Sequence, residues 1–320
     1  MRLIHARSIQ LVDVIEESRP LYTILSHTGE ENEVSFEDMQ GPHATSKSGY
    51  GKIKYACQQA LEDGLEYVWA DTCCINKSSS TELSEAINSM FRWYKNAWDC
   101  YAYLADVHVH GSDVLSQDAI DAAFAQSRWF IRGWTLQELL APSEVHFYSS
   151  DWGKLGTRYT LADSISAVTK IDRAFLLDRE TIGQASIVKR MSWASGRVTT
   201  RLEDTAYCLL GIFDVNMPLL YGEGEKAFIR LQEEIMRHSD DQSLFAWGQE
   251  DEPHWMKANP TKYVRGLLAS SPAEFSTCGN VIPDEFAELE EPHALTNKGV
   301  RLALPVLHHA SQVHRTRSSG

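Results

Sequence analysis

Residues 52–104 have the sequence KIKYACQQALEDGLEYVWADTCCINKSSSTELSEAINSMFRWYKNAWDCYAYL, in which two helical patterns alternate with two apolar runs. Apolar side chains recur at helical spacing over residues 52–63 and 80–95. Residues 67–70 and 100–104 are almost entirely apolar and rich in aromatic side chains, which is typical of strands covered on both faces. This stretch therefore predicts two helix–strand units of an α/β protein.

Two further apolar runs extend the same pattern. Residues 21–25 (LYTIL) precede the quoted stretch, and residues 145–148 (VHFY) follow it. Residues 127–142 (SRWFIRGWTLQELLAP) lie before the last run and predict a third helix. Strands that alternate with helices favour a mainly parallel sheet flanked by helices. The fold class expected is therefore α/β.

The character of the chain changes after residue 155. We expect an α/β core over residues 1–155, a helical continuation over 156–238, and a small β-containing extension over 239–320 that ends in a frayed polar tail. The segments behind this division are two helical patterns at 201–213 and 223–237, and three short strand-like runs at 244–248 (LFAWG), 265–271 (RGLLASS) and 298–306 (KGVRLALPV).

Composition excludes several classes of protein. The 320 residues contain 30 Lys and Arg against 44 Asp and Glu, a net charge of −14, which argues against a nucleic-acid or anionic-membrane partner. No run of 18 apolar residues could span a membrane, and residues 1–20 lack the apolar centre of a signal peptide. The six cysteines show neither a CxxC pair nor metal-ligand spacing. We therefore expect a cytoplasmic protein with reduced core thiols and no metal site.

Glu138 is an unusual residue for its position. On a helical wheel of residues 127–142 it lies among apolar side chains, with Trp134 four residues before it and Ile131 seven before it. A buried carboxylate is costly unless it is paired or used. Two interpretations follow: an ion pair with Arg128 or Arg132, or a functional carboxylate.

Polar residues follow the predicted strands. In parallel α/β sheets, ligands bind beyond the carboxyl ends of the strands. Taken one at a time, such residues are better explained by ordinary loop polarity. His27 can be a general base, but a lone His is more often a hydrogen-bonded structural residue. The residues at the four strand ends are Ser26-His27-Thr28, Asp71-Thr72, Asp106 and Ser149-Ser150-Asp151-Trp152.

Common catalytic and nucleotide-binding motifs do not identify a function for this chain. The chain contains no GxxxxGK[ST], GxSxG or HExxH sequence. Residues 222–227 match GxGxxA, but Pro218 precedes them and two Glu side chains would face a pyrophosphate, so helix capping is the better interpretation. Cys73 has no evident positive neighbour to lower its pKa and is interpreted as a buried thiol.

Four long ungapped runs carry a family resemblance that extends over most of residues 1–305. They are YTILSHT (22–28), residues 49–107, SRWFIRGWTLQELLAP (127–142) and residues 201–235. The chain is similar in these runs to the HET (heterokaryon incompatibility) domain of filamentous fungi. The later LFAWG and RGLLASSPAEFS runs resemble the extension that often follows that domain.

This resemblance implies a function. HET domains trigger programmed cell death when genetically different fungal strains fuse, and they often precede the nucleotide-binding domain of NOD-like receptors. They are considered remote relatives of TIR domains, which have a flavodoxin-like fold. The Trp-Cys-x-x-Glu-Leu helix of TIR enzymes, whose glutamate cleaves NAD, resembles Trp134-Thr-Leu-Gln-Glu138-Leu139. The chain departs from the family at Gly29, where Ser-His-Thr-Trp-Gly is usual.

The resemblance thus implies a cell-death effector that uses Glu138 to cleave NAD, its substrate, without a further cofactor. Ser26, His27, Asp71 and Trp134 would line the site, and Arg128, Arg132 or Lys52 would hold the phosphates. A single carboxylate suffices because nicotinamide leaves as a neutral base from a cationic ring and needs no general acid. Homo-oligomerisation and a NOD-like receptor partner are expected. The alternative is a non-catalytic signalling module that acts through assembly.

Overall fold

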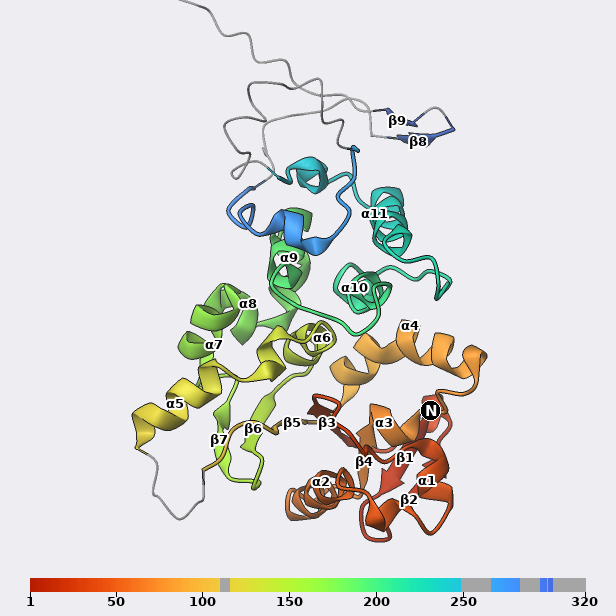
Figure 1. Ribbon diagram of the computed structural model, residues 1–320, viewed down its shortest axis with the longest axis vertical. Coiled ribbons are helices and arrows are strands. Elements are labelled where there is room, and N and C mark those ends of the chain that lie inside the picture. The colour runs from red at the N-terminus through yellow and green to blue at the C-terminus, as the bar shows by residue number, and fades with distance from the viewer. Residues whose placement is uncertain (110–115, 249–265, 283–293, 298, 302–320) are drawn as a thin grey trace, which may run out of the picture.

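Seven strands form one mixed sheet, with the order β2-β1-β4-β3-β5-β6-β7 (Figure 1). The computed structural model describes residues 1–109, 116–248, 266–282, 294–297 and 299–301. The strands are β1 (Arg2–His5), β2 (Gln10–Asp13), β3 (Thr23–His27), β4 (Tyr67–Ala70), β5 (Cys100–Leu104), β6 (Val145–Ser149) and β7 (Lys154–Thr157).

The four central strands are parallel and carry the fold. β3 pairs in parallel with both β4 and β5, and β5 pairs in parallel with β6. In chain order these strands lie 2-1-3-4, the arrangement of flavodoxin-like folds, so the predicted α/β class is confirmed. The three strands outside this central group, β1, β2 and β7, are antiparallel to their neighbours. The sequence did not reveal these three because they are short and only partly buried.

Helices cover both faces of the sheet (Figure 1). The helix α2 (Tyr50–Glu62) connects β3 to β4 on one face, whereas α4 (Ser80–Asn96) and α6 (Thr135–Leu140) lie on the other. The connection from β3 to β4 runs along the sheet in one direction, and the connections from β4 to β5 and from β5 to β6 run in the other. Because such crossovers are right-handed, their helices lie on opposite faces. The remaining helices are α1 (Phe36–Gln40), α3 (Asp71–Cys74), α5 (Gln117–Ala125), α7 (Ala162–Thr169), α8 (Arg173–Leu177), α9 (Ile187–Ala194), α10 (Asp204–Tyr207) and α11 (Lys226–His238).

The predicted single helix over residues 127–142 is wrong. A 3-10 turn over Arg128–Ile131 and the short α6 are separated at Gly133. The Gly133 N–H donates to the carbonyl of Val198 at 2.9 Å, and the Val198 N–H donates to Ile131 at 2.7 Å. These bonds to a distant segment replace the helical ones. Ile131 is consequently 48% exposed and shares no apolar face with Glu138.

The second half of the chain also differs from expectation in places. The predicted helix at 201–213 is divided into α10 and a 3-10 turn at Leu210–Ile212, whereas the pattern at 223–237 forms α11. The LFAWG run is not a strand but overlaps a 3-10 helix, Gln242–Phe245, which Asp241 caps. Residues 266–271 contain no strand.

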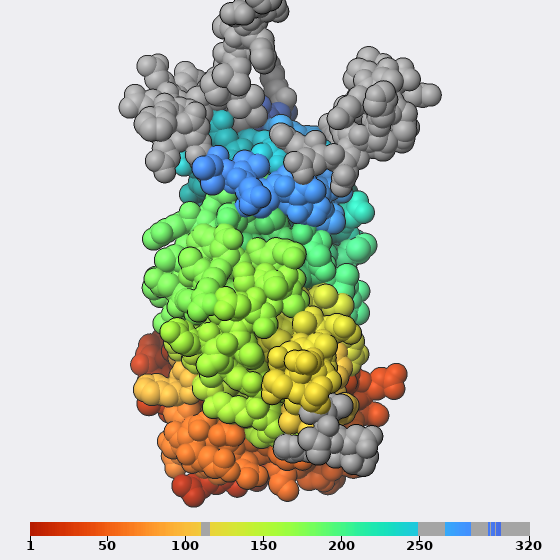
Figure 2. All heavy atoms as spheres, turned by 90° about the vertical axis from the view of Figure 1, so that its left-hand side faces the viewer, coloured from red at the N-terminus to blue at the C-terminus, as the bar shows by residue number. Residues whose placement is uncertain are grey.

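The described part of the C-terminal extension rests on the helices before it. A 3-10 turn at Pro272–Phe275 packs against α9, and Ser186 donates to the Val281 carbonyl at 3.0 Å. Figure 2 shows this segment, in blue, lying on the green helical region. A hairpin joins β8 (Ala294–Thr296) to β9 (Gly299–Arg301). The predicted frayed tail and the rest of the third strand-like run lie outside the described residues.

Two chemical expectations can be checked against the fold. All six cysteines are free and buried, as predicted for core thiols. Over the residues that the structure describes, no helix is both long and apolar enough to traverse a lipid bilayer.

Candidate functional site

The Glu138 side chain is buried in the first turn of α6, with 7% of the residue exposed. No Lys, Arg or His of the described residues forms an ion pair with it. Arg128 pairs instead with Asp106 and Glu30, each at 3.3 Å, and Arg132 donates to Thr200. The ion-pair interpretation of Glu138 is therefore wrong.

A chain of hydrogen bonds holds Glu138 from the sheet side. The Ser26 hydroxyl, near the end of β3, donates to Glu138 Oε2 and accepts from Trp129 Nε1 at 2.8 Å. All three side chains are buried. Trp129 therefore fixes the Ser26 hydroxyl, which in turn aims its hydrogen at the carboxyl group.

Burial raises the pKa of Glu138 to about 8. The hydrogen bond from Ser26 opposes this shift, the charge of Asp71 adds to it, and a hydrogen bond from Tyr94 and the charge of Arg197 oppose it. A carboxyl group with this pKa is mainly protonated at neutral pH. Its protonation state therefore responds to any charge brought near it, which is characteristic of functional sites.

Glu138 opens into a cavity of about 470 Å³. The cavity also reaches His27, Asp71, Trp134 and Arg132, so it holds five of the eight residues that the sequence suggested for the site. Ser26 lies behind the cavity, in contact with Glu138. The structure does not bring Arg128 to this place. The space is within the range of small-molecule sites in proteins.

His27 lines the cavity together with Glu33 and Asp71. Its side chain is 1% exposed, and Nε2 lies 3.7 Å from a Glu33 oxygen and 3.8 Å from an Asp71 oxygen. Neither ring nitrogen has a hydrogen-bond partner among the described residues. Burial and the charge of Lys52 lower the His27 pKa to about 4, so the ring is neutral at pH 7.

Asp71 begins α3 directly after β4. Its side chain accepts a hydrogen bond from Lys77 at 3.0 Å. Burial raises the pKa of Asp71, but the charge of Lys77 and the charge that His27 carries when protonated outweigh that effect and bring it to about 2. Asp71 is therefore ionised beside a neutral histidine with two unpartnered nitrogens, which is an arrangement able to bind hydroxyl groups.

Sequence reasoning missed three residues that line the cavity. Arg201, Asp204 and Tyr221 come from the segment that follows the sheet. The Tyr221 hydroxyl donates to Asp204 at 3.0 Å, and the Arg201 guanidinium lies 4.4 Å from the Tyr221 ring centroid. Nothing within the predicted helix at 201–213 shows that its polar residues meet Glu138; only the tertiary fold does.

The GxGxxA match at residues 222–227 has a structural role. One carboxylate oxygen of Glu203 accepts from the backbone N–H groups of Gly222, at 2.7 Å, and Gly224, at 3.1 Å. Both glycines have positive φ angles, 103° and 60°. The N–H groups that a pyrophosphate would need are therefore already bonded.

The structure also bears on the interpretation of Cys73 and on metal binding. Cys73 is fully buried, and its pKa is raised well above the usual thiol value by the hydrogen bond with Cys74 and by burial, so the buried-thiol interpretation is confirmed. Within the described ranges, no three His, Cys, Asp or Glu side chains are grouped so that they could hold a metal ion.

Comparison with known proteins supports the family resemblance. Residues 22–118 match the family described as heterokaryon incompatibility protein (HET), and residues 226–318 match a domain of unknown function (DUF8212). The vegetative incompatibility protein HET-E-1 of Podospora anserina is 50% identical over 219 residues, which are 68% of this chain.

The matched stretch is only 16% of HET-E-1, so the chain spans about a sixth of that relative. No solved structure matches. The family match nevertheless extends from β3 to beyond β5. It therefore includes β3, which ends at His27, and β4, which Asp71 follows. The chain belongs to the heterokaryon incompatibility (HET) domain proteins.

Proposed function

We propose that this chain is an incompatibility effector that cleaves NAD into nicotinamide and ADP-ribose, with Glu138 as the catalytic residue. The observation that carries the proposal is a buried carboxyl group that has no ion-pair partner among the described residues and opens into a cavity beside Trp134, His27 and Asp71. HET-E-1 is named as a vegetative incompatibility protein, and this supports the biological role.

The chemistry requires one ionised carboxylate near the anomeric carbon. The bond between that carbon and the pyridinium nitrogen breaks, and its electron pair neutralises the ring, so nicotinamide leaves without a proton. The Glu138 carboxylate stabilises the positive charge that develops on the ribose. Water then adds its oxygen to the anomeric carbon and releases a proton.

The raised pKa of Glu138 fits this substrate. A cation within about 4–6 Å favours the charged form of a carboxyl group. The pyridinium ring of NAD brings such a cation, so bound substrate would lower the Glu138 pKa from about 8 and ionise the group in place. The same burial that keeps the group neutral in the free protein strengthens its attraction to the charged substrate.

The other cavity residues take supporting roles in the proposal. Trp134 provides an aromatic wall, and neutral His27 with ionised Asp71 binds ribose hydroxyls. The phosphates need cations that reach the cavity. Arg132 and Arg201 line it, so we assign them this role in place of Arg128.

The test is nicotinamide release from NAD by the purified chain, measured by chromatography over a range of protein concentrations. We expect Glu138→Gln to lower the rate about 100-fold or more. Glu85→Gln is the matched control, because Glu85 is exposed on α4 and does not line the cavity. No release by the wild-type chain, or equal release by Glu138→Gln, would contradict the proposal. A rate that rises more than linearly with protein concentration would support the proposed homo-oligomer.

A non-catalytic signalling module is the second candidate. The observation that favours it is the neutral, hydrogen-bonded state of Glu138, which a structural residue would share. Under this proposal the chain acts by assembly with copies of itself or with a NOD-like receptor. Glu138→Gln, expressed in fungal cells at wild-type level, would then still kill them, whereas loss of killing favours the NAD-cleaving enzyme.

A further inference from the structure

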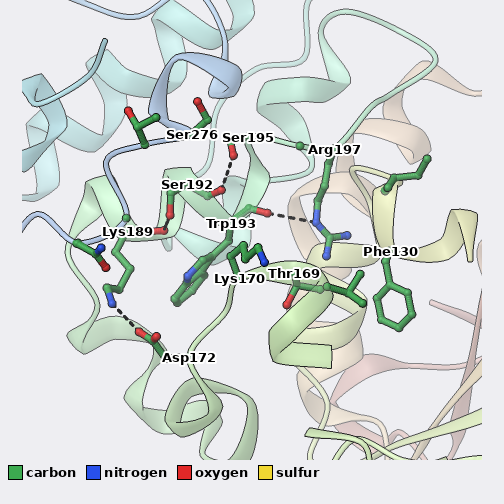
Figure 3. A pocket seen from close by; sticks show the side chains of 16 residues that line it. Phe130, Thr169, Lys170, Asp172, Lys189, Ser192, Trp193, Ser195, Arg197 and Ser276 are labelled. Carbon is green, nitrogen blue, oxygen red and sulfur yellow. Dashed lines mark hydrogen bonds and ion pairs between the residues drawn. The ribbon is translucent and has the colours of Figure 1, made fainter. Parts of the chain in front are cut away.

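Figure 3 shows a second cavity, of about 390 Å³, which is distinct from the Glu138 cavity. The end of α7, the helix α9 with the residues after it, and residues 276–280 of the C-terminal extension line it. Arg197 joins the two cavities: it lines the second one, and its Nη1 donates to Thr135, which lines the first, at 2.9 Å.

The lining of this second cavity is cationic. Lys170, Lys189 and Arg197 face one acidic residue, Asp172, in a chain whose net charge is −14. Asp172 accepts a bond from Lys189 at 2.5 Å, so it offsets one of the three positive charges. Figure 3 shows the Lys189–Asp172 pair to one side of Lys170 and Arg197. Two cations remain without an acidic partner in the cavity lining.

Arg197 carries a donor that the fold does not use. Its Nη1 donates to the Arg132 carbonyl at 2.8 Å and to Thr135, and its Nε donates to the Trp193 carbonyl at 3.3 Å. Its Nη2 is buried and has no hydrogen-bond partner among the described residues. A buried unpaired donor on a charged group is costly, and the positive charge of this group attracts an anion placed in the cavity that Arg197 lines.

The rest of the lining is uncharged. Phe130, Val168 and Trp193 provide an apolar wall, and Ser276 contributes an exposed hydroxyl group at the rim. A bare ion would leave that wall without a partner. The cavity therefore suits a ligand that has both an anionic head and a small apolar body.

We propose that this cavity binds a small organic phosphate, with the phosphate between Lys170 and Arg197 and the apolar body against Trp193 and Phe130. A phosphate matches a guanidinium and an ammonium better than a carboxylate does, because it offers more acceptor oxygens and more charge. The proposal does not depend on cleavage of NAD, because none of these four residues lines the Glu138 cavity.

The probe is phenyl phosphate, titrated into the full chain by isothermal calorimetry. We expect saturable binding to one site, with inorganic phosphate and phenol each binding at least tenfold more weakly. Lys170→Glu should weaken phenyl phosphate binding at least tenfold. Lys54→Glu is the control, because it makes the same charge change at an exposed lysine on α2, away from the cavity.

Two more variants separate the possible results. Ser276→Asp places a carboxylate at the exposed rim and should also weaken binding, whereas Glu138→Gln should leave it unchanged. Equal weakening by Lys54→Glu, or binding of benzoate as tight as that of phenyl phosphate, would overturn the proposal. So would the absence of saturable binding by the wild-type chain.

Discussion

Ser26 connects the first parallel strand to the proposed catalytic residue. Its hydroxyl donates to Glu138 and so lowers the pKa of that group, against the larger effect of burial. Ser26→Ala removes this donor and leaves Trp129 Nε1 without its acceptor. We expect a loss of about 1–3 kcal/mol in the free energy of unfolding. The fall of kcat/KM for NAD on the acid side should also move to higher pH.

Thr23→Val is the matched control for Ser26→Ala. Thr23 lies on the same strand, is equally buried, and donates to the Asp99 carbonyl at 2.9 Å rather than to Glu138. Thr23→Val should lower the free energy of unfolding but leave the pH profile of NAD cleavage unchanged. An unshifted profile in Ser26→Ala would show that the serine only supports the fold.

Gly29 is the position where the chain departs from the usual HET sequence. It lines the mouth of the Glu138 cavity, and an added Cβ there meets no atom within 4 Å. Gly29→Trp therefore has room for the Cβ, and we expect its indole to stack on a base of the substrate, an interaction of about 1–3 kcal/mol. We expect the KM for NAD to fall about tenfold while kcat changes little. A KM equal to that of Gly29→Ala would contradict this expectation.

At the scale of elements, Gly133 explains why the segment 127–142 is not one helix. Local periodicity favours the helix, but the backbone bonds between Gly133 and Val198 end it. A Cβ at Gly133 would lie 2.4 Å from Thr199 Cγ2. Gly133→Ala should therefore destabilise the chain by about 1–3 kcal/mol in urea unfolding, although alanine is the better helix former.

Gly183 provides the comparison for Gly133. It is exposed, and an added Cβ there meets no atom within 4 Å. Gly183→Ala should change the free energy of unfolding by no more than about 0.5 kcal/mol. If Gly133→Ala were equally mild, the close approach of Thr199 to Gly133 would not require a glycine at this position.

The elements that the sequence predicted well are those whose environment is uniform along their length. β4 and β5 are covered on both faces, so their bounds coincide with apolar runs. β3 begins at Thr23 rather than Leu21, because Leu21 is 62% exposed before the sheet begins. The LFAWG run is apolar like a strand, yet Asp241 caps it into a 3-10 turn, a choice that periodicity cannot detect.

At the scale of the whole molecule, the Glu138 cavity needs four parts of the chain that are far apart in sequence. The closeness of His27 and Asp71 could be predicted from the sequence, because both follow parallel strands and parallel strands end at one edge of the sheet. Arg201 and Tyr221 could not be added from the sequence, since no periodicity shows which side chains of a later helical segment fold back over a sheet. Arg128 was assigned by its closeness to Glu138 in sequence, but the helix break directs it to Asp106.

The charges buried in this cavity should govern how stability depends on pH. The Glu138 pKa rises from 4.5 to about 8, so its protonation stabilises the fold fully below pH 4.5, and this contribution is lost as pH rises to 8. The His27 pKa falls from 6.5 to about 4, so its contribution is present above pH 6.5 and is lost as pH falls toward 4. The two effects on stability oppose each other between pH 4.5 and 6.5. Above pH 6.5, of these two groups, Glu138 alone changes the stability with pH.

Glu138→Gln keeps a neutral group at this position at every pH. The free energy of unfolding of the wild-type chain, relative to the variant, should therefore fall by about 2 kcal/mol between pH 6.5 and 8, since each pH unit corresponds to about 1.4 kcal/mol for one proton. Urea unfolding at several pH values measures the difference. Glu85→Gln should run parallel to the wild type throughout. Parallel curves for Glu138→Gln as well would mean that the wild-type carboxyl group is already ionised at pH 6.5, because an ionised group has no proton to lose over this range.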